Sequence, residues 1–183
     1  MKRIVCVLFG SIFLLAAGLN AQSTPPDVDL AHETLRLNSN VDLWRKTLAE
    51  IKVDVIPVPF SEQRLIAASR ESCSSWFDTL QQETSKRQQR PDLTAQVVLL
   101  VSVLQTQHCI EVLAASLTNA YRAARESAKG TLESAGWRTL RWANEVGKIT
   151  SELRGVYENV EFLVTNELAT ADEKLALPSC HGG

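Results

Sequence analysis

The sequence predicts an all-α protein, an antiparallel up-and-down bundle of three long helices with a shorter N-terminal helix. An apolar residue recurs every three or four positions from Ala128 to Leu163, with Thr139 as the one polar member. Such a 3.5-residue repeat is typical of a helix that lays a narrow apolar seam against another helix. Proline- or glycine-containing segments divide the rest of the chain into helical lengths. The 183 residues suffice for one domain with a sizeable core.

The N-terminus has the pattern of a secretory signal peptide. Met1-Lys2-Arg3 is basic, Ile4 to Gly18 is mostly apolar, and Ala21 offers a small residue for cleavage before Gln22. An uncleaved anchor is the alternative, but the apolar run falls short of the roughly 20 residues that a bilayer span needs. We therefore expect residues 1–21 to be removed and the protein to be secreted, either to the cell exterior or to a periplasm.

The charge balance argues against a nucleic-acid partner. Removal of Lys2 and Arg3 leaves 17 basic residues against 21 acidic ones, a net charge of −4. The densest basic cluster, Lys86, Arg87 and Arg90, is interleaved with glutamines. It is interpreted as a solvated helix end and not as a basic binding patch.

The first helix has its firmest pattern between residues 37 and 51. Apolar residues there follow four–three–four–three spacing: Leu37, Val41, Trp44, Leu48 and Ile51. Ser39 and Asp42 resemble a capping box, which predicts a start near Asn40. In the alternative, Leu30 to Leu37 forms a separate turn or extends the helix.

The segment from Val53 to Phe60 is predicted to be an extended connector. Pro57 and Pro59 push their preceding residues toward extended geometry. Its apolar side chains are expected to be partly buried: Val55, Ile56, Val58 and Phe60. A short edge strand is the alternative.

The second helix is predicted from Ser61, as its cap, to about Gln89. Its apolar positions are Leu65, Ile66, Cys73, Trp76, Phe77 and Leu80. The sequence is wholly polar after Leu80. Pro91-Asp92 then ends this helix and caps the next one.

The third helix starts at Leu93 and is the most apolar part of the mature chain. Residues 97–104 contain one polar member, Ser102, so we expect burial on most sides. Glutamines around this run, with His108 and Glu111, argue against a second membrane span. One seam can be followed through it: Leu99, Val103, Thr106, Ile110, Leu113, Leu117.

The turn that follows is placed at Lys129-Gly130-Thr131, with a turn near Gly136 as the alternative. The first choice sets Leu99 opposite Val160 and Leu117 opposite Trp142 in an antiparallel hairpin. The fourth helix then runs from about Leu132 to Ala171, and its glycines at 136, 147 and 155 suggest close helix crossings or slight bends. The bundle domain spans residues 22–177, and residues 178–183 are expected to be a disordered tail.

Secretion permits disulfides, and the mature chain has three cysteines. If the second and third helices pack antiparallel around Arg90-Pro91-Asp92, Cys73 and Cys109 lie directly opposite each other in the hairpin. We predict that they form a disulfide, which would close a loop of about 37 residues and contribute roughly 3–4 kcal/mol. Cys180 is then the odd thiol.

The motif search finds no catalytic constellation. The chain has no phosphate-binding glycine loop, no His-Glu-x-x-His, no Gly-x-Ser-x-Gly and no repeated Glu-x-x-His. His108, next to Cys109 and with Cys73, could form a metal or catalytic cluster. Adjacent helical residues point about 100° apart, however, so we favour a boundary histidine paired with Glu111. No cofactor and no metal are predicted.

The tryptophans divide into core and surface positions. Trp44, Trp76 and Trp142 fall on apolar seams and are predicted to be core residues. Trp137 lies off the seam and is expected to be exposed.

One surface is singled out as a binding site: an apolar groove beside Val97, Val98, Val101 and Leu104. The register places these residues opposite residues 78–85, one of the most polar stretches although it contains Leu80, so they stay uncovered if the first helix is short. In the alternative, Leu30, Leu35 and Leu37 fill the gap.

These observations predict a non-enzymatic secreted protein that binds a partner protein, a surface or a lipid-like ligand, with a homodimer as one form of partner. The alternative is a small enzyme or metal-binding protein that uses His108 near Cys73 and Cys109. The sequence leaves open which partner is bound.

Overall fold

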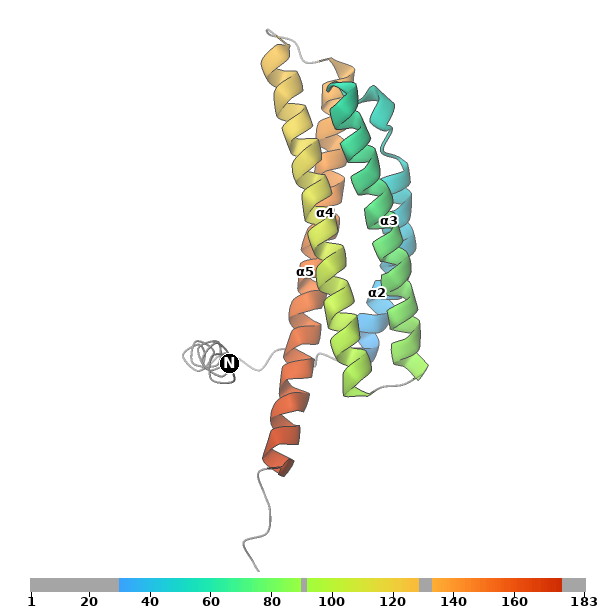
Figure 1. Ribbon diagram of the computed structural model, residues 1–183, viewed down its shortest axis with the longest axis vertical. Helices are drawn as coiled ribbons and strands as arrows, with labels where there is room; N and C mark the ends of the chain where they lie inside the picture. The colour runs from blue at the N-terminus through green and yellow to red at the C-terminus, as the bar shows by residue number, and fades with distance from the viewer. Residues whose placement is uncertain (1–29, 90–91, 129–132, 176–183) are drawn as a thin grey trace, which may run out of the picture.

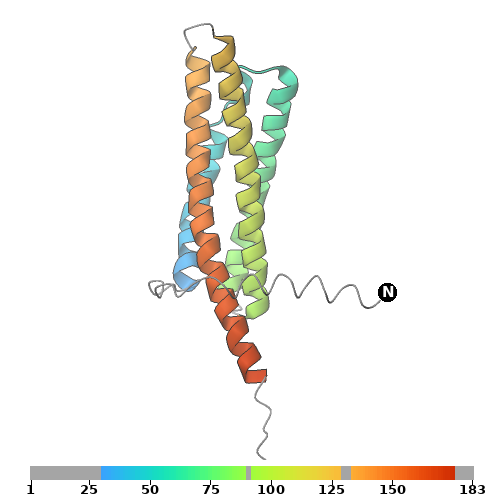
Figure 2. The same ribbon diagram turned by 90° about the vertical axis from the view of Figure 1, so that its left-hand side faces the viewer.

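The computed structural model describes residues 30–89, 92–128 and 133–175, which form an antiparallel bundle (Figure 1). Its elements are α2 (Leu30–Ala49), the 3₁₀ turn η1 (Val53–Val55), α3 (Phe60–Gln89), α4 (Leu93–Ser127) and α5 (Ser134–Leu175). The helices run alternately up and down one long axis in both views (Figures 1 and 2). The predicted all-α bundle is confirmed, whereas the signal peptide at 1–21 and the tail at 178–183 lie outside the described residues.

Each helix packs against two neighbours. α4 contacts α3 and α5, and α2 contacts the same two helices from the other side. The buried residues come from all four helices and include Leu37, Val41, Leu48, Ile66, Phe77, Leu80, Leu99, Val103, Ile110, Leu113, Leu117, Val146, Ile149, Leu153, Val156 and Val160. The rings of Trp44 and Phe77 lie 5.7 Å apart within this core.

α2 begins at Leu30, so the alternative in which residues 30–37 extend the helix is right and a start near Asn40 is wrong. Ser39 lies inside the helix, and its hydroxyl donates to the Arg36 carbonyl at 2.9 Å. The added turns bury Glu33, whose Oε1 accepts a hydrogen bond from Asn159 Nδ2 of α5 at 2.9 Å. This contact explains how a charged residue can occupy the interior side of α2.

The connector between α2 and α3 is a 3₁₀ turn followed by a short extended stretch, and among the described residues it forms no strand. Ile56 is buried as expected, but Phe60 is 73% exposed. α3 starts one residue early because the Pro59 carbonyl already accepts the amides of Glu62 and Gln63. Ser61 therefore lies in the first turn and is not the cap. Leu65, which was expected on the apolar face, is 71% exposed.

α4 starts at Leu93 as predicted, whereas α5 ends at Leu175, four residues beyond the expected Ala171. The predicted turn at Lys129-Gly130-Thr131 lies outside the described residues. Asp92 caps α4, with its carboxylate accepting the Ala95 amide at 2.7 Å. α4 ends at Ser127, and Gly136 lies inside α5, so the alternative turn at Gly136 is wrong. The antiparallel register is visible in Tyr121 and Trp137, whose rings lie 6.4 Å apart near the turn.

α5 is longer than its neighbours. Its C-terminal end extends past the other three helices in both views (Figures 1 and 2). Residues 165–170 are accordingly all exposed.

The glycines of α5 do not mark close helix crossings at positions 147 and 155. A Cβ atom added at either glycine would meet no atom within 4 Å outside its own helix backbone. The expectation of close crossings is wrong at these two sites, because both lie away from the tight part of the interface.

Replacing Gly147 and Gly155 by alanine should stabilise the protein. Glycine in a helix interior is less favourable than alanine by about 0.8–1.0 kcal/mol, so the double variant should gain about 2 kcal/mol in the free energy of unfolding. Urea denaturation measures this gain. The reverse change on an exposed position of α4, Ala123→Gly, is the matched control and should lose about 1 kcal/mol. A double variant that is less stable than the parent would show that the glycines are required by packing.

Candidate functional site

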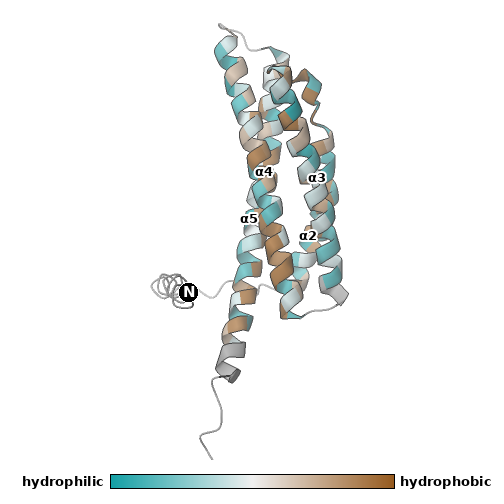
Figure 3. Ribbon diagram, in the orientation of Figure 1, coloured by the Kyte–Doolittle hydropathy of each residue, from teal (hydrophilic) through white to brown (hydrophobic). Residues whose placement is uncertain are grey.

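The candidate site is a row of exposed apolar side chains on α4. Val97 is 38% exposed, and the others are exposed by 41–46%. We call this row the α4 outer face: Val97, Val98, Val101, Leu104 and Val112. The N-terminal half of α4 stands out as the most hydrophobic stretch turned toward the viewer in Figure 3. The four residues singled out from the sequence thus lie on one exposed surface.

The surface is the convex side of a helix and not the expected groove. α2 reaches far enough to close the bundle, with Leu37 buried and Leu30 partly buried against the core, although Leu35 stays 62% exposed. The first helix therefore does not fall short. The α4 outer face is exposed for a different reason, since it lies on the side of α4 opposite the seam that packs against α3 and α5.

The inner side of α4 carries several polar groups among its buried apolar residues. Gln96, Ser102, Thr106 and Gln107 are all buried. The hydroxyls are satisfied within the helix, because Ser102 donates to the Val98 carbonyl at 2.9 Å and Thr106 donates to the Ser102 carbonyl at 2.7 Å.

The two buried glutamines each donate a hydrogen bond from the side-chain amide to a glutamate at the edge of the bundle. Gln96 Nε2 donates to a carboxylate oxygen of Glu167, and Gln107 Nε2 donates to Glu111 Oε1 at 2.9 Å. The side-chain oxygens of both glutamines are buried and have no hydrogen-bond partner in the described part of the chain. These two unpaired oxygens lower stability, although most of the inner side of α4 is an apolar seam: Leu99, Val103, Ile110, Leu113 and Leu117.

A polar rim borders the face on the α5 side. Glu111 pairs with Arg154 at 3.2 Å. Tyr157, one turn further along α5, donates to Glu161 Oε1 at 2.9 Å. Burial raises the pKa of Tyr157 above its ordinary value, and the hydrogen bond and negative charge of Glu161 raise it further. The phenol is therefore a neutral donor at physiological pH.

The cysteine and histidine candidates do not form a joint site. Cys73 and Cys109 are joined as a disulfide between α3 and α4, with Cα atoms 5.5 Å apart, within the usual range. The bond occupies both sulfur atoms. His108 is exposed, and Glu111 accepts from Gln107 and Arg154, so the expected pairing of His108 with Glu111 is replaced by these contacts. The described residues contain no cluster of three or more histidines, cysteines or carboxylates that could hold a metal.

Trp44 and Trp137 follow the prediction, whereas Trp76 and Trp142, which were expected in the core, are only partly buried. Trp44 is buried, and its Nε1 donates to Glu152 Oε2 at 2.9 Å; Trp142 is partly buried against the core. Trp137 is 57% exposed, as expected. Trp76 is only partly buried, because it lies toward the edge of the α3 face.

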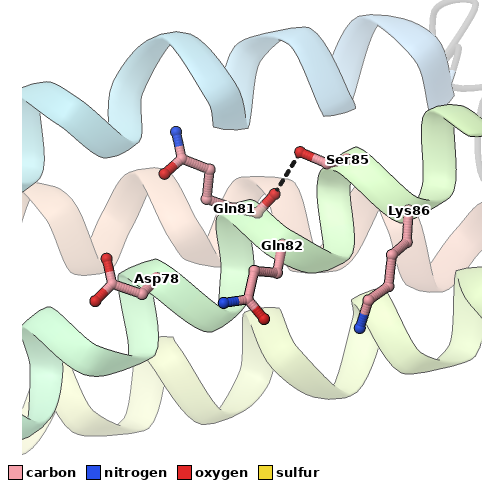
Figure 4. Close-up of a pocket in the computed structure, with 5 residues that line it drawn as sticks. All are labelled: Asp78, Gln81, Gln82, Ser85 and Lys86. Atoms are coloured by element: carbon pink, nitrogen blue, oxygen red, sulfur yellow. Dashed lines mark hydrogen bonds between the residues drawn. The ribbon is translucent and has the colours of Figure 1, made fainter.

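A second surface feature is an open polar pocket of about 580 Å³ on α3 (Figure 4). It is lined by Asp78, Gln81, Gln82, Ser85 and Lys86. Arg45 of α2 borders it, with its guanidinium donating to Asp78 at 2.6 Å and to Gln81 at 2.9 Å. These contacts tie α2 to α3. The lining side chains are ordinary solvated groups, and they supply no nucleophile paired with a base.

α4 is the one described helix that is long and apolar enough to cross a membrane. The core helix of a soluble bundle passes the same test, and the inner side of α4 is buried against α3 and α5.

Comparison with known proteins adds no relative. The chain matches no protein family model, no curated protein and no solved structure.

Removing the disulfide should destabilise the bundle. The two cysteines are 36 residues apart, so the double variant Cys73→Ala with Cys109→Ala should lose about 3–4 kcal/mol in the free energy of unfolding. Guanidinium denaturation measures the loss. Cys180→Ser is the control and should unfold like the parent. Recovery of Cys73 and Cys109 as separate alkylated thiols in an unreduced peptide map would contradict the bond.

Proposed function

We propose that this protein is a secreted, non-enzymatic binding protein and that the α4 outer face is its contact surface for an apolar partner. The observation that carries the proposal is that Val101 and Leu104, with their three valine neighbours, form one exposed apolar face on a helix whose opposite side is already fully buried in the bundle. Contiguous exposed apolar surface of this kind commonly marks an interaction site.

Covering the α4 outer face with a partner would contribute several kcal/mol to the free energy of binding. Complete burial of a valine or leucine side chain contributes about 1.5–3 kcal/mol. The five side chains of the α4 outer face keep roughly two-fifths of their surface exposed. A partner that covers them would therefore gain roughly 3–6 kcal/mol before the costs of association.

The charge pattern supports an apolar partner. From Leu93 to Ile110, α4 contains no aspartate, glutamate, lysine or arginine. The ion pair of Glu111 and Arg154 lies at the border of the face and not within it. Charged residues are depleted in the centres of protein interfaces and retained at their rims. The enzyme or metal-binding alternative would need free Cys73 and Cys109 thiolates, which the disulfide consumes.

Val101→Glu should abolish binding without unfolding the protein. Val101 is 45% exposed, so the glutamate can remain solvated and the free energy of unfolding should change by less than about 1 kcal/mol. The fluorescent apolar dye anilinonaphthalene sulfonate, which binds exposed apolar surface, should bind the parent at low protein concentration and bind the variant much less.

The matched control is Leu65→Glu on α3, which places the same charge at an exposed apolar residue away from the α4 outer face. This control should bind the dye like the parent. Thermal unfolding followed by circular dichroism separates the two explanations for a loss of binding. A large drop in melting temperature for Val101→Glu would mean that the residue belongs to the core and would contradict the proposal.

A further inference from the structure

We infer that the α4 outer face binds the same face of a second copy of this chain, with the two α4 helices antiparallel around a two-fold axis beside Leu104. The inference rests on the proposed function, because it names the partner of the same surface. Four properties carry it: the spacing of the exposed residues, their self-complementarity, the absence of features that suit a membrane, and the size of the face.

The spacing of the outward residues is that of a helix-packing seam. Outward residues succeed one another by steps of four, three, four, four and three: Val97, Val101, Leu104, His108, Val112 and Ala115. All of them are exposed. Spacing of this kind places side chains as knobs for the holes of a facing helix. α4 therefore carries two seams, one for the bundle and one directed outward.

The outward seam is complementary to itself when reversed. Around an axis beside Leu104, Val97 faces Val112 of the second copy, and Val101 faces His108. Thr94 likewise faces Ala115. These pairs place the axis between residues 104 and 105, so the two Leu104 side chains lie one residue apart along the helix at the centre. A two-fold interface requires that one patch match itself in this way. An unrelated partner would not require such symmetry.

The same residues suit a membrane surface poorly. Helices that lie on membranes combine large apolar and aromatic residues with lysine or arginine on their polar flanks. The α4 outer face consists of four valines and one leucine, and no basic residue occurs from Leu93 to Ile110. The net charge of −4 that remains without Lys2 and Arg3 also disfavours an anionic lipid surface.

The size of the face predicts a reversible dimer. From Val97 to Val112 the helix rises about 22 Å, and one side of a helix is about 10 Å wide. Two facing strips of this size cover about 440 Å² in total, so flanking side chains of α4 must supply the rest of the roughly 1,000 Å² at the lower limit of specific interfaces. We therefore expect monomer and dimer to exchange with protein concentration.

Sedimentation velocity of the mature secreted chain over a dilution series tests the inference. The parent should shift from dimer to monomer on dilution. Leu104→Glu should raise the dissociation constant about a hundredfold, because the two-fold axis sets two carboxylates side by side at the centre. The matched control Leu65→Glu, on α3, should dimerise like the parent. Val97→Glu provides a second test if Leu104→Glu fails to fold.

Disulfide trapping tests the antiparallel arrangement in a Cys180→Ser background. Leu104→Cys should form a linked dimer on mild oxidation. Val97→Cys alone should not, because the two copies of residue 97 would lie about 22 Å apart along the axis. A mixture of Val97→Cys with Val112→Cys should cross-link. Self-linkage of Val97→Cys would indicate parallel helices and overturn the inference.

Failure of the inference can be told apart from failure of the proposed function. A chain that stays monomeric at every concentration, yet loses dye binding on Val101→Glu, overturns the dimer and leaves the apolar binding surface in place. Cosedimentation of that monomer with phosphatidylcholine vesicles would identify lipid as the occupant. Loss of neither dye binding nor dimerisation in Val101→Glu and Leu104→Glu would overturn both.

Discussion

The pairing of α4 with α5 is the contact on which the rest of the bundle depends. The α5 seam through Val146, Leu153 and Val160 is fully buried, as is the α4 seam through Leu99, Ile110 and Leu117. This pairing fixes the rotation of α4 about its own axis, and the Cys109 bond to α3 fixes it a second time. Turning α4 to bury its valines would expose the seam and break the bond. The exposure of the α4 outer face follows from this constraint.

Those parts of the fold that depend on local spacing could be predicted from the sequence. The seam of α5, the Asp92 cap and the level positions of Cys73 and Cys109 all follow from residue numbers along a helix or across a short turn. The start of α2 could not, because Glu33 is buried only through Asn159, which lies 126 residues away. The exposure of Phe60 likewise could not be predicted, because it depends on α3 starting at the Pro59 carbonyl, which accepts the first amides of the helix.

The sequence predicts which residues form the candidate surface, but the expected reason for their exposure is wrong. Local hydropathy pointed to Val97 and Leu104, and the expected reason was a first helix too short to cover them. In a helix that is apolar nearly all round, hydropathy alone does not say which side faces inward. The polar Thr106 decides this, since it continues the buried seam between Val103 and Ile110. That seam can be followed from the sequence and gives the outward direction of Val101, whereas the reach of α2 does not follow from local spacing.

The overhang of α5 gives the molecule a gradient of local stability. Val164 is the last buried residue of this helix in the described part of the chain, and Gln96 reaches Glu167 one turn later. Residues 168–170 are exposed, so backbone hydrogen bonds must hold this part of the helix without burial of its side chains, which short helical segments do poorly in water. Amide hydrogens after residue 167 should therefore exchange through local fraying, whereas those near Leu153 exchange only when the whole bundle opens. A protease that requires an unfolded segment would accordingly cut the overhang first and leave the four-helix core intact.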